Sequence, residues 1–274
     1  MQIDLKQGDC LELMKSIPDG SIDLVLTDPP YKTTSRGNAG NSGGMLQKKI
    51  NMKGKVFNHN DIKPSQYIPE FYRILKDGSH CYIMTNHVNL QEILNVATQC
   101  GFKFIKSLIW DKGNKIMGQF YMSQFEYILF FRKGKGAKIN NCGTSDILSI
   151  PNKKTKDKNG NNIHDTEKPV NLMKILIGNS SKENEVVLDP FMGVGSTIIA
   201  GIELNRRVIG FELDEKYFNV AKERIKMTLQ EQIEKLEKEL SQTSYLDVLH
   251  QEMLERELER LKKIASEMEL TKNE

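Results

Sequence analysis

The feature that most constrains this fold is the alternation of short apolar runs with amphipathic stretches along the first 212 residues. Short apolar runs bounded by turn residues predict buried strands, and apolar residues at helical spacing predict helices between them. We expect strands at residues 3–6, 22–26, 80–85, 102–110, 126–132, 186–188 and 207–212, with helices at 10–16, 65–75, 86–100, 169–177 and 196–204. This order is typical of an α/β protein with a doubly wound, mostly parallel sheet.

After Glu215 the pattern changes to long, charged helix. Apolar residues recur at helical spacing in two series, residues 229–240 and 254–268, which a polar break near residues 241–244 separates. We therefore expect a first domain of residues 1–225 and a coiled-coil-like helical tail of residues 226–274. The apolar seam of the tail needs a partner, which is either its own domain or, through dimerisation or recruitment, another protein chain.

Composition excludes several classes of protein. With 38% hydrophobic residues, 27% charged residues and a mean hydropathy of −0.48, the chain has no apolar run long enough to span a bilayer. The first residues lack a basic region followed by an apolar run, so we expect no secretion signal and a cytoplasmic protein with no membrane partner. The four cysteines form no CxxC pair and no cluster with histidine, so we expect neither a metal site nor a disulfide.

The formal charge of +3 hides two strongly basic segments. Residues 32–64 carry seven Lys/Arg against one acidic residue, and residues 132–164 carry eight against two. Both are rich in Gly, Asn, Ser and Lys, which is typical of exposed loops. Such loops are either simply solvated or contact a polyanion, because clustered lysines neutralise phosphates. Charge alone leaves both interpretations open.

A glycine-rich turn at residues 189–197, Asp-Pro-Phe-Met-Gly-Val-Gly-Ser-Thr, follows a short apolar strand and opens a helix. Its glycines let a ligand approach the backbone at the helix N-terminus. Glu212 ends the next strand, where a carboxylate can accept hydrogen bonds from a ribose diol. Together these features predict a site for an adenosine-type ligand, whereas the turn alone is also explained by structural glycines.

The second chemical motif is the run Asp28-Pro29-Pro30-Tyr31 at the end of a predicted strand. Two prolines fix a stiff, non-helical turn that leaves carbonyl oxygens free. A carboxylate and a carbonyl can accept both hydrogens of an exocyclic amino group, while the tyrosine can stack on the attached ring. The alternative is a rigid loop that ends in a core tyrosine.

Taken in chain order, the motifs at residues 8–9, 28–31, 164–169, 189–197 and 212–217, followed by Arg224, resemble those of a known family. The chain is similar to S-adenosylmethionine-dependent amino-type DNA methyltransferases of the permuted β class, in which the DPPY-type catalytic motif precedes the cofactor motif. The resemblance implies a seven-stranded methyltransferase sheet and a place in DNA methylation and restriction–modification. Glu167 departs from the family pattern, which has Gln there, and so do Asp165 and residues 192–195.

The resemblance implies methyl transfer to a base that is flipped out of duplex DNA. Asp28, Pro29, Pro30 and Tyr31 would form the catalytic motif, and Asp at its first position favours adenine N6 over cytosine N4. The residues that it implies for S-adenosylmethionine are Asp9, Cys10, Lys168, Asp189, Phe191, Gly193, Gly195, Ser196, Thr197 and Glu212. No cysteine nucleophile and no metal is needed.

We expect the two basic segments to bind double-stranded DNA, with residues 32–64 as a loop near the active site and residues 132–164 as the target-recognition segment. The candidate DNA-binding residues are Arg36, Lys48, Lys49, Lys53, Lys133, Lys135, Lys153 and Lys154. Three alternatives remain open: a cytosine N4 enzyme, an RNA or protein methyltransferase, and a non-catalytic DNA-binding subunit that recruits partners through its tail. The gene would be bacterial or phage-borne.

Overall fold

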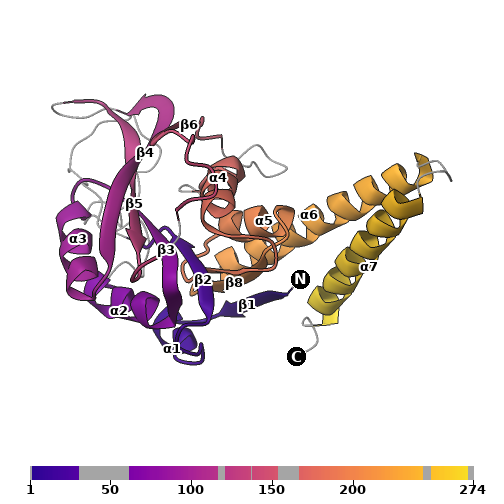
Figure 1. The fold of residues 1–274 in the computed structure, drawn as a ribbon, viewed down its shortest axis with the longest axis horizontal. Coiled ribbons are helices and arrows are strands. Elements are labelled where there is room, and N and C mark those ends of the chain that lie inside the picture. The colour runs from indigo at the N-terminus through magenta and orange to yellow at the C-terminus, as the bar shows by residue number, and fades with distance from the viewer. Residues whose placement is uncertain are drawn as a thin grey trace.

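The computed structural model describes residues 2–30, 62–116, 121–136, 138–153, 167–242 and 248–270. The strands are β1 (Ile3–Gln7), β2 (Ile22–Thr27), β3 (Leu75–Thr85), β4 (Lys103–Ile116), β5 (Ser123–Arg132), β6 (Ile147–Ser149), β7 (Val186–Asp189) and β8 (Arg207–Glu212). The helices are α1 (Cys10–Met14), α2 (Pro64–Ile74), α3 (Leu90–Gln99), α4 (Val170–Ser180), α5 (Ser196–Glu203), α6 (Glu215–Gln242) and α7 (Val248–Leu270) (Figure 1).

All the strands join one sheet in the order β1-β8-β7-β2-β3-β5-β4-β6. Neighbours pair in parallel except β5, which runs antiparallel to both β3 and β4. The predicted doubly wound, mostly parallel class is confirmed. Among the residues that the structure describes, the sheet has eight strands, so the expected count of seven is corrected. The added strand is β6, which pairs with β4 inside the segment that we expected to be loop and buries Leu148. A strand of three residues within a lysine-rich segment is too short to show the alternation of apolar and polar residues that predicts a strand.

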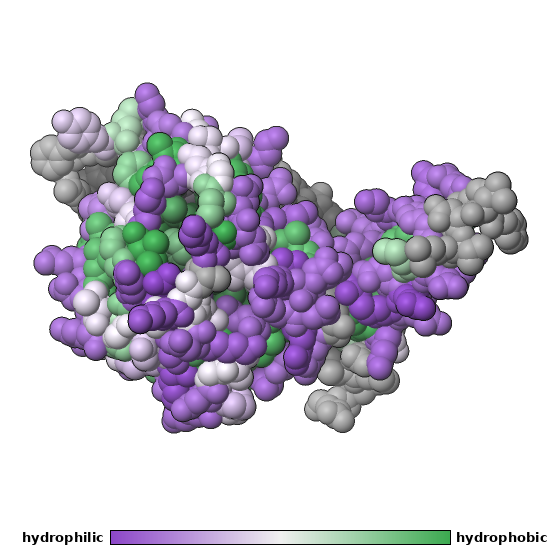
Figure 2. Space-filling model, viewed as in Figure 1, coloured by the Kyte–Doolittle hydropathy of each residue, from purple (hydrophilic) through white to green (hydrophobic). Residues whose placement is uncertain are grey.

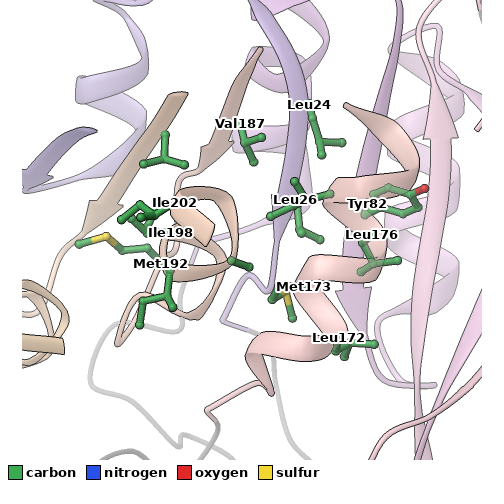
Figure 3. Close-up of a cluster of buried hydrophobic side chains, with 14 of the residues drawn as sticks. Leu24, Leu26, Tyr82, Leu172, Met173, Leu176, Val187, Met192, Ile198 and Ile202 are labelled. Atoms are coloured by element: carbon green, nitrogen blue, oxygen red, sulfur yellow. The ribbon is translucent and has the colours of Figure 1, made fainter. Parts of the chain in front are cut away.

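The two faces of the sheet bury different side chains. Leu24 and Leu26 of β2 pack with α4 and α5 on one face, whereas Val25 between them packs with α1, α2 and α3 on the other. Figure 3 shows the first face, where Leu176 of α4 and Ile198 of α5 lie on either side of Leu26 in the same cluster. This alternation follows from the period of two along a strand, and it explains why the central strands are apolar throughout.

Strands β4 and β5 form a longer hairpin than the sequence predicts. We expected them to span residues 102–110 and 126–132, but β4 continues to Ile116 and β5 begins at Ser123. The added residues are mostly polar, and apart from the buried Lys112 those whose side chains are described are half-buried or exposed, so hydrophobic periodicity does not reveal them. As a result, the hairpin extends the sheet at the edge where the parallel strands end.

The helical tail is continuous with the first domain. The predicted boundary at residue 225 falls inside α6, whose Ile225, Leu229 and Ile233 belong to the core beneath α5. Helix α7 folds back along α6 (Figure 1), and Leu261 and Ile264 join the same core. Arg260 also donates to the Asn205 side chain at 2.6 Å. In the part of the chain that the structure describes, the seam therefore packs largely on its own domain.

The visible surface of α6 and α7 is mostly hydrophilic (Figure 2), as expected when the apolar seam faces inward. None of the helices that the structure describes combines the length and the apolar composition that a bilayer span requires.

Two helical glycines offer a matched test of packing. A Cβ added at Gly201 of α5 would lie 2.4 Å from Cγ1 of the buried Val208, whereas one added at Gly178 of α4 would meet nothing within 4 Å. We expect Gly201→Ala to lower the free energy of unfolding by about 1–3 kcal/mol through overpacking. Gly178→Ala should raise it by about 0.5–1 kcal/mol, because alanine is the better helix former. Urea unfolding would measure both, and a stable Gly201→Ala protein would contradict the close packing of α5 on β8.

Candidate active site and cofactor loop

The predicted motif residues converge at the carboxyl edge of the parallel strands. Asp9 follows β1, Asp28 follows β2, Asp189 ends β7 and Glu212 ends β8. Because these strands are parallel neighbours, their carboxyl ends share one edge, where open α/β sheets bind ligands. Tyr31, the last residue of the DPPY motif, lies outside the described residues.

Asp28 is half-buried at the end of β2, in front of the buried Pro29. Its Oδ2 accepts a hydrogen bond from the Lys168 ammonium, whereas its buried Oδ1 has no hydrogen-bond partner among the described residues. Burial raises the pKa of Asp28 to about 6, although the neighbouring Lys168 lowers it. A buried acceptor without a partner is costly, so Oδ1 is suited to accept a hydrogen from a bound ligand.

Asp189 holds the beginning of the glycine turn against β2. Its Oδ1 accepts hydrogen bonds from the Thr27 hydroxyl at 2.8 Å and from the Phe191 N–H at 3.1 Å. Burial raises the pKa of Asp189 to about 6, and hydrogen bonds from Thr197 and Thr27 lower it. Asp189 is thus engaged inside the fold, where it fixes the turn on which a cofactor would rest.

The turn itself forms an open cradle. Gly193 and Gly195 have φ angles of 53° and 83°, in the region that favours glycine. A Cβ at Gly193 would meet no described atom within 4 Å, and the buried Ser196 Oγ at the start of α5 has no hydrogen-bond partner in the described chain. Space above the backbone and an unsatisfied hydroxyl fit a ligand that approaches this turn closely.

Glu212 ties the turn to β8. Its Oε2 accepts the Gly193 N–H at 2.9 Å and its Oε1 accepts the Asp214 N–H at 2.8 Å. Each carboxylate oxygen has a further lone pair, which can receive a ribose hydroxyl. The Gly8 N–H donates to the Glu212 carbonyl at 2.9 Å, which brings Asp9 and Cys10 beside the carboxylate. These are the residues expected at an adenosine site, and their arrangement fits one.

Arg224 of α6 contacts the glycine turn, a role that we did not predict from the sequence. Its guanidinium donates to the Val194 carbonyl at 2.5 Å and to Glu167 Oε1 at 2.5 Å. The residue therefore joins the glycine turn to the segment that precedes α4. Glu167, which replaces the family's usual Gln, contributes a negative charge to this contact.

Two further charged side chains near Asp28 were also missed. Lys112 of β4 and Glu126 of β5 form an ion pair at 2.9 Å, and Glu126 lies 3.4 Å from the Lys168 ammonium. The sequence signal was a glutamate directly ahead of the apolar run 127–131. Lys168, which we expected among the residues that bind S-adenosylmethionine, lies between the acidic side chains of Asp28 and Glu126.

The second basic segment is divided between the two edges of the sheet. Because β5 is antiparallel to β3, Lys133 and Lys135 follow it at the edge opposite Asp28. The Lys133 ammonium donates to the carbonyls of Tyr72 at 2.6 Å and Leu75 at 2.7 Å, where α2 ends. Lys133 is thus engaged within the fold, and Lys135 follows it at the same remote edge, so the expected role of these two lysines in DNA binding stays a prediction.

Lys153, by contrast, is exposed and follows β6, which is parallel to β4 and ends near the site. The other predicted DNA-binding residues, Arg36, Lys48, Lys49, Lys53 and Lys154, lie outside the described part of the chain.

Comparison with known proteins shows the family to which the chain belongs. A family model described as DNA methylase, of the N6/N4 methyltransferases, matches residues 22–223. The chain belongs to this DNA methylase family. It is an amino-methyltransferase of the DPPY type, and its cofactor is S-adenosylmethionine.

Relatives within the DNA methylase family include two type II methyltransferases. M.HinfI of Haemophilus influenzae is 31% identical over 241 residues, which cover 80% of this chain and 67% of the relative. M2.MboI of Moraxella bovis is 27% identical over 243 residues, covering 81% and 86% of the two chains.

Solved structures share the fold. The M1.HpyAVI complex with S-adenosylmethionine matches with a TM-score of 0.61 at 24% identity, over 81% of this chain and all of the other. The cytosine-N4-specific PvuII DNA methyltransferase matches with a TM-score of 0.62 at 17% identity, over 83% and 91% of the two chains.

Proposed function

We propose that this DNA methylase transfers the methyl group of S-adenosylmethionine to N6 of adenine in double-stranded DNA. The observation that carries the proposal is the half-buried Asp28, whose Oδ1 lacks a hydrogen-bond partner among the described residues, at the first position of the DPPY motif. Asp at that position favours adenine, in the pattern of the family that the motif resembles.

The chemistry required of these residues is to make a weak nucleophile reactive. The lone pair of an aromatic amine is delocalised into the ring. Asp28 and the Pro29 carbonyl, by accepting the amine hydrogens, would favour a pyramidal nitrogen and direct its lone pair. S-adenosylmethionine supplies the electrophilic methyl group, so the protein contributes orientation and electrostatics. The base must leave the helix to reach the site, and Tyr31 would stack on it.

The cofactor would be held by the residues around the open cradle. Asp9 and Cys10 would contact the adenine edge, Glu212 the ribose, and Phe191, Gly193, Gly195, Ser196 and Thr197 the methionine end. Asp189 would act indirectly, since its carboxylate fixes the turn.

The basic segments would supply the contacts to DNA, with Arg36, Lys48, Lys49 and Lys53 near the active site and Lys153 and Lys154 in the recognition segment. We expect alanine at both Lys48 and Lys49 to weaken DNA binding and to flatten the slope of log K against log salt by about 1–2. Fluorescence anisotropy over a salt series measures this slope. Alanine at Lys235 and Lys238, on the acidic tail, should leave it unchanged. An unchanged slope in the Lys48/Lys49 variant would refute the phosphate contacts.

The decisive experiment follows labelled methyl from S-adenosylmethionine into duplex DNA, RNA and protein, and then identifies the product nucleoside. Label in DNA as N6-methyladenine supports the proposal. N4-methylcytosine alone would overturn the adenine assignment and favour the specificity named for the PvuII enzyme. Label in RNA or protein alone would overturn the DNA substrate, and no transfer would favour a DNA-binding subunit. Sequencing the methylated DNA would give the target site.

A further inference from the structure

Beside the active site, the fold buries a row of four charges of alternating sign. Lys112 Nζ donates to Glu126 Oε1 at 2.9 Å, Glu126 Oε2 lies 3.4 Å from Lys168 Nζ, and Lys168 donates to Asp28 Oδ2. Both lysine side chains are 9% exposed, Glu126 is 18% exposed and Asp28 is 22% exposed. We call these four side chains the charge row.

The charge row is assembled from four separate elements. Lys112 is on β4, Glu126 on β5, Lys168 just before α4 and Asp28 just after β2. The ring of Trp110, the only tryptophan of the chain, lies under both ammonium groups, 5.7 Å from Lys112 Nζ and 5.9 Å from Lys168 Nζ. Trp110 is the ladder partner of Glu126, and its Nε1 donates to the Ile150 carbonyl at 2.8 Å. The register of the β4–β5 hairpin therefore sets the position of the row.

Stability alone is a weak reason to bury such a row. Desolvation of buried ion pairs often cancels their attraction, and apolar side chains of similar size frequently stabilise a fold better. One end of the charge row is instead Asp28, the side chain that must be ionised for the proposed chemistry. A protonated Asp28 would present an O–H donor where the amine needs an acceptor.

We propose that Lys112, Glu126 and Lys168 are positioning residues: the two lysines keep Asp28 ionised, and Glu126 holds Lys168 in place on Asp28 Oδ2, so that Oδ1 is directed at the target amine. Lys168 binds Asp28, Glu126 fixes the Lys168 ammonium and balances its charge, and Lys112 in turn fixes Glu126. The inference rests on the proposed catalytic role of Asp28. It also assigns Lys168 to the carboxylate of Asp28 and not to that of the cofactor.

The titratable groups that face Asp28 come from every element around it. Lys168 and Lys112 lower the pKa of Asp28, and Glu126 raises it. Asp189 of β7 is a further neighbouring carboxylate, with its own pKa raised to about 6, and Tyr67 of α2 has a phenol pKa raised by burial. Burial opposes ionisation of Glu126, but the ammonium groups of Lys168 and Lys112 lower its pKa. Removing Lys168 should therefore raise the pKa of Asp28, and removing the charge of Glu126 should lower it.

The test compares the pH dependence of single-turnover methyl transfer in Lys168→Met and Glu126→Gln proteins. In Lys168→Met the acid limb should move up by about 1 pH unit or more, because an opposite charge has been removed from the carboxylate. In Glu126→Gln the limb should move down. Lys168→Arg keeps the charge and should leave the limb close to that of the wild type. The ¹³C shift of the Asp28 carboxyl carbon, identified by its loss in Asp28→Asn, should follow the same order without any turnover.

The matched control is Lys174→Met, which removes a lysine on α4 that pairs with Glu203 at 2.5 Å. It should leave the acid limb unchanged. Two results would overturn the inference. The first is an acid limb that moves in the same direction in Lys168→Met and Glu126→Gln, or that moves in neither. The second is a raised KM for S-adenosylmethionine in Lys168→Met with an unchanged acid limb, which would indicate that Lys168 binds the cofactor. Full activity in Asp28→Ala would instead refute the proposed role of Asp28, so the two failures are distinguishable.

Discussion

Replacing Asp28 by alanine should lower the rate of methyl transfer by about 10²–10³-fold, the usual cost of losing one preorganised electrostatic group. Alanine removes the buried oxygen Oδ1, which has no hydrogen-bond partner among the described residues and which we propose as the acceptor for the amine. Binding of S-adenosylmethionine should persist, because the hydrogen bonds of Gly193 and Glu212 within the described cofactor loop do not involve Asp28. Single-turnover kinetics with duplex DNA measure the rate, and calorimetry measures the binding of the cofactor.

Two variants sharpen the Asp28 experiment. Asp28→Asn keeps one carbonyl acceptor without the charge, so its rate should fall between those of the wild type and Asp28→Ala. Asp19→Ala removes an exposed aspartate, 2.5 Å from Arg73 in the turn before the same strand, and should leave the rate unchanged. If Asp28→Ala methylated DNA at the wild-type rate, the DPPY carboxylate would not be the acceptor.

The local parts of the site could be predicted because a few neighbouring residues dictate each one. The turn after Asp189 needs φ angles that favour glycine at positions 193 and 195, and the two prolines after Asp28 exclude a helix. Parallel strands then bring both turns to one edge. The comparisons confirm the family and the cofactor that the order of these motifs implied.

The parts that escaped prediction depend on strand direction and register. Lys133 lies at the edge opposite Asp28 because β5 runs antiparallel to β3. The spacing of hydrophobic residues does not indicate the direction of a strand within a sheet. The pairing of Trp110 with Glu126 is set by register across a hairpin whose outer residues are polar. Likewise, the helical spacing predicted two tail helices but left the partner of their seam open. Here the folded core supplies it, through Leu229 and Leu261.

Replacing Glu212 should weaken the binding of S-adenosylmethionine more than any other single change in the cofactor loop. Alanine removes the acceptor for Gly193 N–H and Asp214 N–H together with the proposed ribose contact. Hydrogen bonds to a charged group contribute about 1.5–3 kcal/mol each, so the Kd should rise by about 100-fold or more. Glu12→Ala, on the exposed face of α1, should leave the Kd unchanged. Calorimetric titration with S-adenosylmethionine measures both.

Glutamine at position 212 separates the two tasks of this carboxylate. Both oxygens of Glu212 accept backbone N–H groups, so a side-chain amide must turn its NH₂ group toward one of these donors. Glu212→Gln should therefore raise the Kd by about 10- to 100-fold, although glutamine is nearly isosteric. If glutamine bound the cofactor as well as glutamate does, a neutral oxygen would suffice for the ribose and the loop would not depend on Glu212. A loss close to that of alanine would show instead that holding Gly193 is the larger part of its task, because the loop must be formed before the ribose can bind.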